Sequence, residues 1–268
     1  MAELKNTMEI FKLLNHSNCR DCGEKTCLAF AAAVFKGKRR IEECPHLAPE
    51  IIEKYSGNTK RAQSIEEDMA ETVEKLKARI ADIDLSEAAI RVKGRFANGK
   101  LTIRILGKDF NVDSTGRLFS EIHINHWLVI PVLTYILEGG GTPIAGKWAS
   151  FRELPDGMVR NPLFQRRCED PLKHVADEYP DFFADLLDIF DGKQVDNLFD
   201  SDISIVLYPL PLVPMLMCYW KPDEGMESSF HLFFDQNAAD NLPIDALYTL
   251  TAGFVHMFEK IAGRHGGK

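Results

Sequence analysis

Four of the chain's six cysteines gather near its start, in the order Cys19, Cys22, Cys27 and Cys44. Their spacing, C-x2-C-x4-C-x16-C, places three thiols on one short loop and brings a fourth from a returning segment. Thiolates arranged in this way can surround an iron–sulfur cluster, with the loop supplying three ligands and the later cysteine the last one. The pattern therefore predicts a metal-cluster module at the beginning of the chain.

The residues around these cysteines suit thiolate chemistry. Gly23 follows directly after Cys22, where a missing Cβ lets the backbone approach inorganic sulfide closely. Thr26 is predicted to cap a helix over residues 27–35, so that the positive end of this helix faces the anionic thiolates. Gly37 is expected to end the helix.

Three other roles for the cysteines stay open at this point. A zinc site is one, although zinc sites more often use two C-x2-C pairs and this stretch holds one such pair. Disulfides are another, but no signal peptide precedes the cysteines, so we expect a cytoplasmic protein with reduced thiols. In the third, the cluster is present but serves only to hold the fold.

Further residues in this stretch carry a family resemblance: Leu13-Leu14, Asn18-Cys19, Cys22-Gly23, Cys27, Phe30-Ala31 in an alanine-rich helix, Gly37 and Cys44-Pro45. On these residues the first 57 positions resemble the four-iron module of the corrinoid iron–sulfur protein large subunit. They are also similar to the cluster-bearing subunit of the Rnf electron-transport complex. The resemblance implies a [4Fe–4S] cluster ligated by Cys19, Cys22, Cys27 and Cys44.

The charge of the chain is uneven. Residues 1–60 carry ten Lys and Arg against eight Asp and Glu, whereas residues 61–268 carry 22 against 32. An acidic larger part argues against nucleic-acid binding as the main task.

One long uncharged run, residues 203–220, is close to the minimum length of a membrane span. It contains Pro209, Pro211 and Pro214, each of which would remove a hydrogen bond from a helix. We therefore predict two strands, over 203–208 and 213–220, around a proline-rich corner, and no membrane span.

The remaining pattern predicts an α+β fold. Apolar residues recur at helical spacing over 65–80, and Asn98-Gly99 predicts a hairpin between strands at 88–96 and 100–106. A third short strand is expected over 108–112, and a buried helix over 124–137 that starts or kinks at Pro131. The expected order is a small helical iron–sulfur module (1–57), a linking helix (58–87) and a larger mixed α/β domain with antiparallel strands (88–268).

A second candidate site is a loop that holds Lys147, Trp148 and Arg152 after the glycines at 139–141. A glycine cluster followed by cations can cradle an anion, although the Gly-Lys-Ser/Thr ending of a phosphate loop is missing. A plain turn and strand is the favoured alternative. Residues 146–157, together with Trp220 and Phe233-Phe234-Asp235, resemble an uncharacterised domain found in anaerobes after cluster modules, from which no activity carries over.

These features predict single-electron transfer to a partner protein, or to a ligand held by the larger domain. A corrinoid-related partner is one candidate, although the corrinoid motif Asp-x-His-x-x-Gly is missing from the sequence. The alternative is a redox- or ligand-sensing binding module with a structural cluster. A self-contained enzyme is least supported, because no catalytic triad order, nucleotide loop or paired-carboxylate motif stands out.

Overall fold

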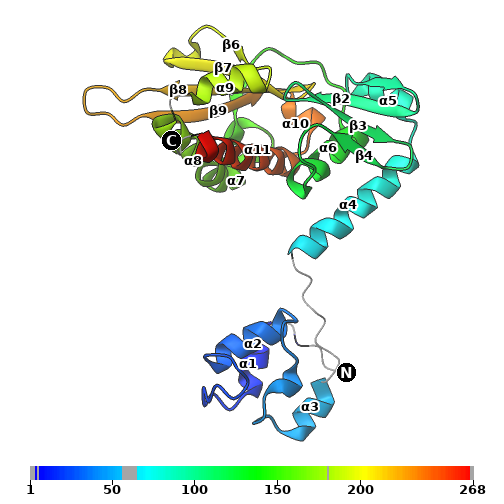
Figure 1. The fold of residues 1–268 in the computed structure, drawn as a ribbon, viewed down its shortest axis with the longest axis vertical. Coiled ribbons are helices and arrows are strands. Elements are labelled where there is room, and N and C mark those ends of the chain that lie inside the picture. The colour runs from blue at the N-terminus through cyan, green and yellow to red at the C-terminus, as the bar shows by residue number, and fades with distance from the viewer. Residues whose placement is uncertain (1–3, 5, 56–64, 180, 266–268) are drawn as a thin grey trace. The chain divides into compact units, whose positions relative to one another are not determined.

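In the computed structural model the chain forms two compact units, residues 1–71 and 72–268 (Figure 1). The structure describes residues 4, 6–55, 65–179 and 181–265. Helices and antiparallel sheets occur together, and a small helical unit precedes a larger mixed one, which confirms the predicted α+β class. The finer division at residues 57 and 87 stays a prediction.

The small unit consists of three short helices and one turn of 3-10 helix: α1 (Thr7–Leu13), α2 (Cys27–Phe35), η1 (Ile41–Glu43) and α3 (Pro49–Tyr55). The predicted helix over 27–35 is confirmed, because the Thr26 hydroxyl oxygen accepts a hydrogen bond from the Ala29 N–H at 3.0 Å. Helix α1 begins after Asn6, whose side-chain oxygen accepts a hydrogen bond from the Glu9 N–H at 2.9 Å. A single apolar core holds the unit together: Ile10, Leu14, Phe30, Ala31, Val34, Ile41, Cys44 and Leu47.

The strand predicted over residues 88–96 is wrong. The stretch 88–96 was expected to be a strand, but helix α5 (Leu85–Arg91) follows α4 (Ile65–Ala81), and strand β1 is confined to Arg95–Ala97. The Asp84 carboxylate accepts hydrogen bonds from two backbone N–H groups of the first turn and so starts this helix. The buried residues of this stretch follow helical spacing rather than the alternation of buried and exposed residues that is typical of a strand: Leu85, Ala88, Ala89 and Val92.

The first sheet is an antiparallel meander in the order β1-β2-β3-β4, with β2 (Lys100–Ile105), β3 (Lys108–Asp113) and β4 (Leu118–Ser120). The predicted hairpin is confirmed, because Asn98 and Gly99 both have positive φ (52° and 72°) at its turn. Leu106 and Gly107 form the next turn in the same left-handed region, with φ of 47° and 74°.

The second sheet is also antiparallel, in the order β5-β9-β8-β7-β6. Its strands are β5 (Trp148–Ser150), β6 (Lys193–Gln194), β7 (Ile203–Leu210), β8 (Val213–Trp220) and β9 (Ser229–Asp235). The two strands predicted around the proline-rich corner are thereby confirmed, and the register shifts between Leu207 and Leu210, where Pro209 cannot donate to the ladder. Within the described residues, no helix combines the length and the apolar character needed to cross a bilayer.

The helices of the larger unit after α5 are α6 (His126–Glu138), α7 (Gly157–Phe164), α8 (Asp170–Glu178), α9 (Phe182–Ile189), α10 (Ala238–Asn241) and α11 (Ile244–His265). Shorter turns are η2 (Phe151–Glu153), the π-helical η3 (Gln165–Glu169) and η4 (Leu198–Asp200). Helix α6 begins at His126 rather than at Pro131, because Asn125 accepts a hydrogen bond from the Leu128 N–H. The π-helical η3 runs directly into α8, and Pro171 lies in the first turn of α8, where its missing N–H needs no partner.

The five-stranded sheet has two different faces. Inward-pointing residues of β7, β8 and β9 join the main core with the helices, and α7, α8 and α11 run along one side of this sheet in Figure 1. The opposite face carries a smaller cluster around Val206, Leu216 and Cys218.

Tyr135, on α6, connects three elements of the main core. Its ring is fully buried, its hydroxyl donates to the Val92 carbonyl at 2.9 Å, and the same oxygen accepts from the Leu212 N–H at 3.2 Å. The end of α5 and the β7–β8 turn are therefore held to α6 through one phenol.

Replacing Tyr135 with Phe should lower the free energy of unfolding of the larger unit by about 1–3 kcal/mol, because two buried backbone groups lose their partner. Urea unfolding followed by circular dichroism measures this change. Tyr248→Phe is the matched control, since its hydroxyl makes no hydrogen bond to a described residue in the structure. Equal stabilities for the two variants would contradict the assigned role of Tyr135.

Candidate metal centre

The structure brings the four predicted cysteines together in the small unit. Burial raises the pKa of the Cys44 thiol, and the neighbouring Cys22, Cys19 and Cys27 raise this pKa further. Cys22 and Cys27 also pack against the apolar core that contains Cys44. All four are free thiols, so they are available as ligands.

The loop that carries the first three cysteines is wound tightly. His16, Asn18 and Arg20 have left-handed φ values of 57°, 51° and 69°, and Gly23 has 82°. Such conformations are uncommon outside glycine and are concentrated where surrounding contacts enforce them. The loop therefore needs external contacts to hold its shape.

Asn18 supplies two of these contacts to Cys27. Its side-chain oxygen accepts a hydrogen bond from the Cys27 backbone N–H at 2.8 Å, and its own N–H donates to the Cys27 sulfur at 3.3 Å. This pair of bonds fixes the first thiol of α2 relative to the start of the loop.

Arg39 ties the loop to the segment that returns with Cys44. Its Nη1 lies 2.9 Å from Glu43 Oε2, and its Nε lies 3.7 Å from Glu24 Oε1. A Cβ added at Gly23 would lie 3.0 Å from Arg39 Nη2, so the arginine also covers the backbone next to Cys22. One guanidinium thus spans both sides of the cysteine set.

A second polar contact joins the same two segments. His46 Nε2 lies 2.7 Å from Asp21 Oδ2, and this hydrogen bond is the main reason why the pKa of the Asp21 carboxyl is lowered. The Cys19 thiol contributes a weaker hydrogen bond to the same carboxylate. Ligand atoms of Cys19, Asp21 and His46 all lie within 4.8 Å of one another, a mixed set that would also suit zinc.

The other histidine beside the cysteines has a structural partner. His16 Nε2 lies 2.8 Å from the Phe11 carbonyl oxygen, and its ring stacks on Phe11 with the centroids 4.2 Å apart. Both contacts direct this side chain toward helix α1.

The thiols differ in exposure. Cys19 is exposed, Cys22 and Cys27 are partly buried, and Cys44 is 7% exposed. The cysteine set therefore has one side in the apolar core and the other at the surface of its unit.

The residues present fit an iron–sulfur cluster. Four thiols supply its usual ligand set. Backbone N–H groups of Asn18 and His46 donate to Cys27 and Cys44 sulfur, and the N-terminus of α2 presents positive charge beside Cys27. These groups compensate the negative charge that a thiolate-bound cluster brings.

The second candidate loop has a different character. Trp148 opens β5 and pairs with Asp235, the Lys147 carbonyl accepts from the Gln236 N–H at 2.8 Å, and Arg152 is exposed on η2. The buried Asp235 carboxylate accepts the N–H groups of the residues just before Lys147, which fixes the approach to the strand. The segment forms the turn and strand of the alternative interpretation, and its ligand role stays a prediction.

Sequence reasoning did not identify Arg39 and Asp21 as parts of this site. Both are charged residues close to the cysteines, which is the signal that could have marked them. Eight other charged residues lie in the same stretch of residues 20–43, however, and the sequence does not say which carboxylate each cation meets.

Two family models match the chain. Residues 14–46 match the family described as "Putative Fe-S cluster", and residues 84–257 match "Domain of unknown function (DUF3786)". The first match confirms that the N-terminal unit carries an iron–sulfur cluster domain.

Curated relatives match the same N-terminal part. The acetyl-CoA decarbonylase/synthase complex subunit gamma of Methanopyrus kandleri is 41% identical over 54 residues, which are 20% of this chain and 12% of that protein. The corrinoid/iron-sulfur protein large subunit of Moorella thermoacetica is 44% identical over 41 residues, or 15% and 9% of the two chains. The chain thus spans about a tenth of the length of these relatives. No solved structure matches it significantly.

Replacing Arg39 with Met should speed the loss of iron to a chelator, because the variant lacks both ion pairs, to Glu24 and to Glu43, that hold the cysteine loop and the returning segment. Stopped-flow absorbance measurements after addition of a strong iron chelator give this rate. Arg40→Met is the control, since the Arg40 side chain is 82% exposed and reaches Glu43 only at 4.0 Å. If both variants lose iron at the wild-type rate, Arg39 does not hold the two segments together.

Proposed function

This chain belongs to the family described as domain of unknown function DUF3786 and carries an iron–sulfur cluster domain ahead of it, and we propose that it is a single-electron carrier. The proposed cofactor is one [4Fe–4S] cluster, with Cys19, Cys22, Cys27 and Cys44 as its ligands. A cluster of this kind, when bound, accepts and returns one electron at a time.

The observation that carries the proposal is the graded exposure of the four thiols. Cys44 anchors the set in the core, whereas Cys19 is exposed and Cys22 and Cys27 reach partly to the surface. An electron carrier needs such an accessible edge, because a partner must approach closely. A cluster that served only to hold the fold would be expected to have all of its ligands covered.

The surroundings of the thiols support a redox role as well. Hydrogen bonds to ligand sulfur and solvent exposure both set the reduction potential of a cluster. Asn18 donates to Cys27 sulfur, the His46 N–H donates to Cys44 sulfur, and Arg39 adds a positive charge nearby. All three favour the more negative, reduced state and would raise the potential.

The proposed partner is another protein. Relatives that share the N-terminal module are named as a subunit of an acetyl-CoA decarbonylase/synthase complex and as a corrinoid/iron-sulfur protein, so both act with further components. By analogy with these relatives, we propose that this chain also docks a partner protein, and a corrinoid-related protein is one candidate. Their substrates are not carried over, because the shared part is short.

The test is a redox titration of anaerobically purified full-length protein, followed by EPR, with iron, zinc and sulfide counted on the same sample. We expect about four irons and four sulfides per chain and a reversible one-electron signal. Zinc in place of iron would instead indicate a zinc site, for which Cys19, Asp21 and His46 are candidate ligands. Iron that cannot be reduced reversibly would exclude electron transfer and leave a structural cluster.

Replacing each of Cys19, Cys22, Cys27 and Cys44 with Ala should lower the iron content to well below half of the wild-type value, because the cluster loses one of its four ligands. Iron analysis and visible absorbance after anaerobic purification measure the effect. Cys218→Ala is the matched control, since Cys218 is a buried thiol of the larger unit. Full iron content after any one of the four replacements would remove that residue from the ligand set.

A further inference from the structure

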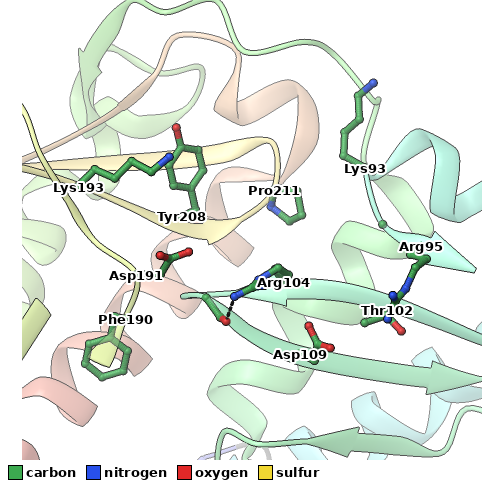
Figure 2. A pocket seen from close by; sticks show the side chains of 12 residues that line it. Lys93, Arg95, Thr102, Arg104, Asp109, Phe190, Asp191, Lys193, Tyr208 and Pro211 are labelled. Atoms are coloured by element: carbon green, nitrogen blue, oxygen red, sulfur yellow. Dashed lines mark hydrogen bonds between the residues drawn. The ribbon is translucent and has the colours of Figure 1, made fainter. Parts of the chain in front are cut away.

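A cationic cleft lies within the larger unit, where its two sheets meet. The cleft has a volume of about 580 Å³ and is lined from the turn before β1 and the start of β1, from the β2–β3 hairpin, and from β6 and β7. Figure 2 shows Lys193 and Tyr208 on one side, Lys93 and Arg95 on the other, and Arg104 between them. Four of the lining side chains are therefore cations, drawn from segments about one hundred residues apart.

These four cations are available to a ligand. Among the described residues, none of Lys93, Arg95, Arg104 and Lys193 forms an ion pair. Arg104 donates one hydrogen bond to the Gly107 carbonyl, and Lys193 lies 5.7 Å from the centre of the Tyr208 ring. The remaining side-chain N–H groups of Arg95 and Arg104 are available to donate hydrogen bonds to a ligand.

The cleft stands out against the charge of its surroundings. Residues 88–108 contain six Lys and Arg and no Asp or Glu, while residues 177–202 contain nine acidic residues and one cation, Lys193. That single cation lines the cleft. Asp109 and Asp191 also line it, which leaves an excess of positive groups in a domain that is negative as a whole. A cleft lined by one sign of charge concentrates ligands of the opposite sign.

Backbone contacts fix the shape of this cleft. The Leu106 N–H donates to the Tyr208 carbonyl at 2.9 Å, which joins the β2–β3 hairpin to β7. A Cβ added at Gly107 would lie 2.5 Å from the Cβ of Asp191, so glycine is needed where the hairpin meets the second sheet. Three of the cations, Arg95, Arg104 and Lys193, are therefore presented by strands, and Lys93 lies in the turn before β1.

We propose that this cleft binds a small organic molecule with two or more negatively charged oxyanion groups, of the size of a nucleotide. Arginine forks bind phosphate and carboxylate oxygens in pairs, and a volume of this size falls in the usual range of small-molecule sites. Tyr208 offers an aromatic face beside the charges. A nucleic-acid polymer is disfavoured, because the domain around the cleft is acidic.

The experiment is isothermal titration of the full-length protein, with and without its iron, using inorganic pyrophosphate, ATP and citrate as probes. We expect dissociation constants below about 1 mM for at least one probe, and affinity that falls steeply with salt. Pyrophosphate and ATP on one side and citrate on the other distinguish phosphate from carboxylate as the recognised group. Because binding is read without iron as well, this result is independent of the proposed electron transfer.

Variants locate the site. Arg95→Gln, Arg104→Gln and Lys193→Gln should each weaken binding about tenfold, since each removes a charge-assisted hydrogen bond. Arg152→Gln tests the competing loop, and this variant should bind as the wild type does if the cleft is the site. The side chains of Arg95 and Lys193 make no hydrogen bond to a described residue, so replacing them should leave the fold intact even if Arg104→Gln disturbs the hairpin.

The proposal is overturned if no probe binds, or if the three cleft variants bind as the wild type does. Loss of binding in Arg152→Gln alone would move the site to the loop after the glycines. Tighter binding of a single-stranded oligonucleotide than of ATP, weakened by the same cleft variants, would replace the small molecule with a nucleic acid.

Discussion

The gathering of four cysteines in one small unit, with Cys44 buried, is the constraint on which that unit depends. Each of Cys19, Cys22 and Cys27 disfavours the ionised form of Cys44, and burial of Cys44 adds to this cost. The unit answers with groups of the opposite polarity: the Asn18 and His46 N–H groups, the Arg39 guanidinium and the N-terminus of α2.

The same groups serve the backbone as well as the charges. Arg39 reaches Glu24 and Glu43, and His46 reaches Asp21, so each joins the cysteine loop to the returning segment. The left-handed residues of the loop are tolerated because these contacts, together with the Asn18–Cys27 bonds, fix both of its ends. The placement of the four cysteines and the stability of this fold therefore depend on one set of contacts.

The larger unit follows a different principle, in which two antiparallel sheets are joined by a few buried polar groups. Tyr135 binds the end of α5 and the β7–β8 turn to α6, and Leu106 pairs with Tyr208 across the sheets. Unsatisfied backbone groups in these places would be costly, which makes the junction specific. The cationic cleft lies at this junction, because the basic residues of the first sheet lie beside β6 and β7 there.

The sequence by itself determined the features that depend on near neighbours. The cysteine spacing indicated the cluster domain, Thr26 indicated the start of α2, and Asn98-Gly99 indicated the first hairpin, because caps and turns are set by a few adjacent residues. It failed at 88–96, where an Asp84 cap and buried alanines favour a helix over a strand. Only the tertiary structure decided that Arg39 meets Glu24, that His46 meets Asp21, and that Lys193 and Arg104 line one cleft. The physical reason is that such contacts join residues distant in the chain, and many charges in the sequence could satisfy them equally well before the fold selects one pairing.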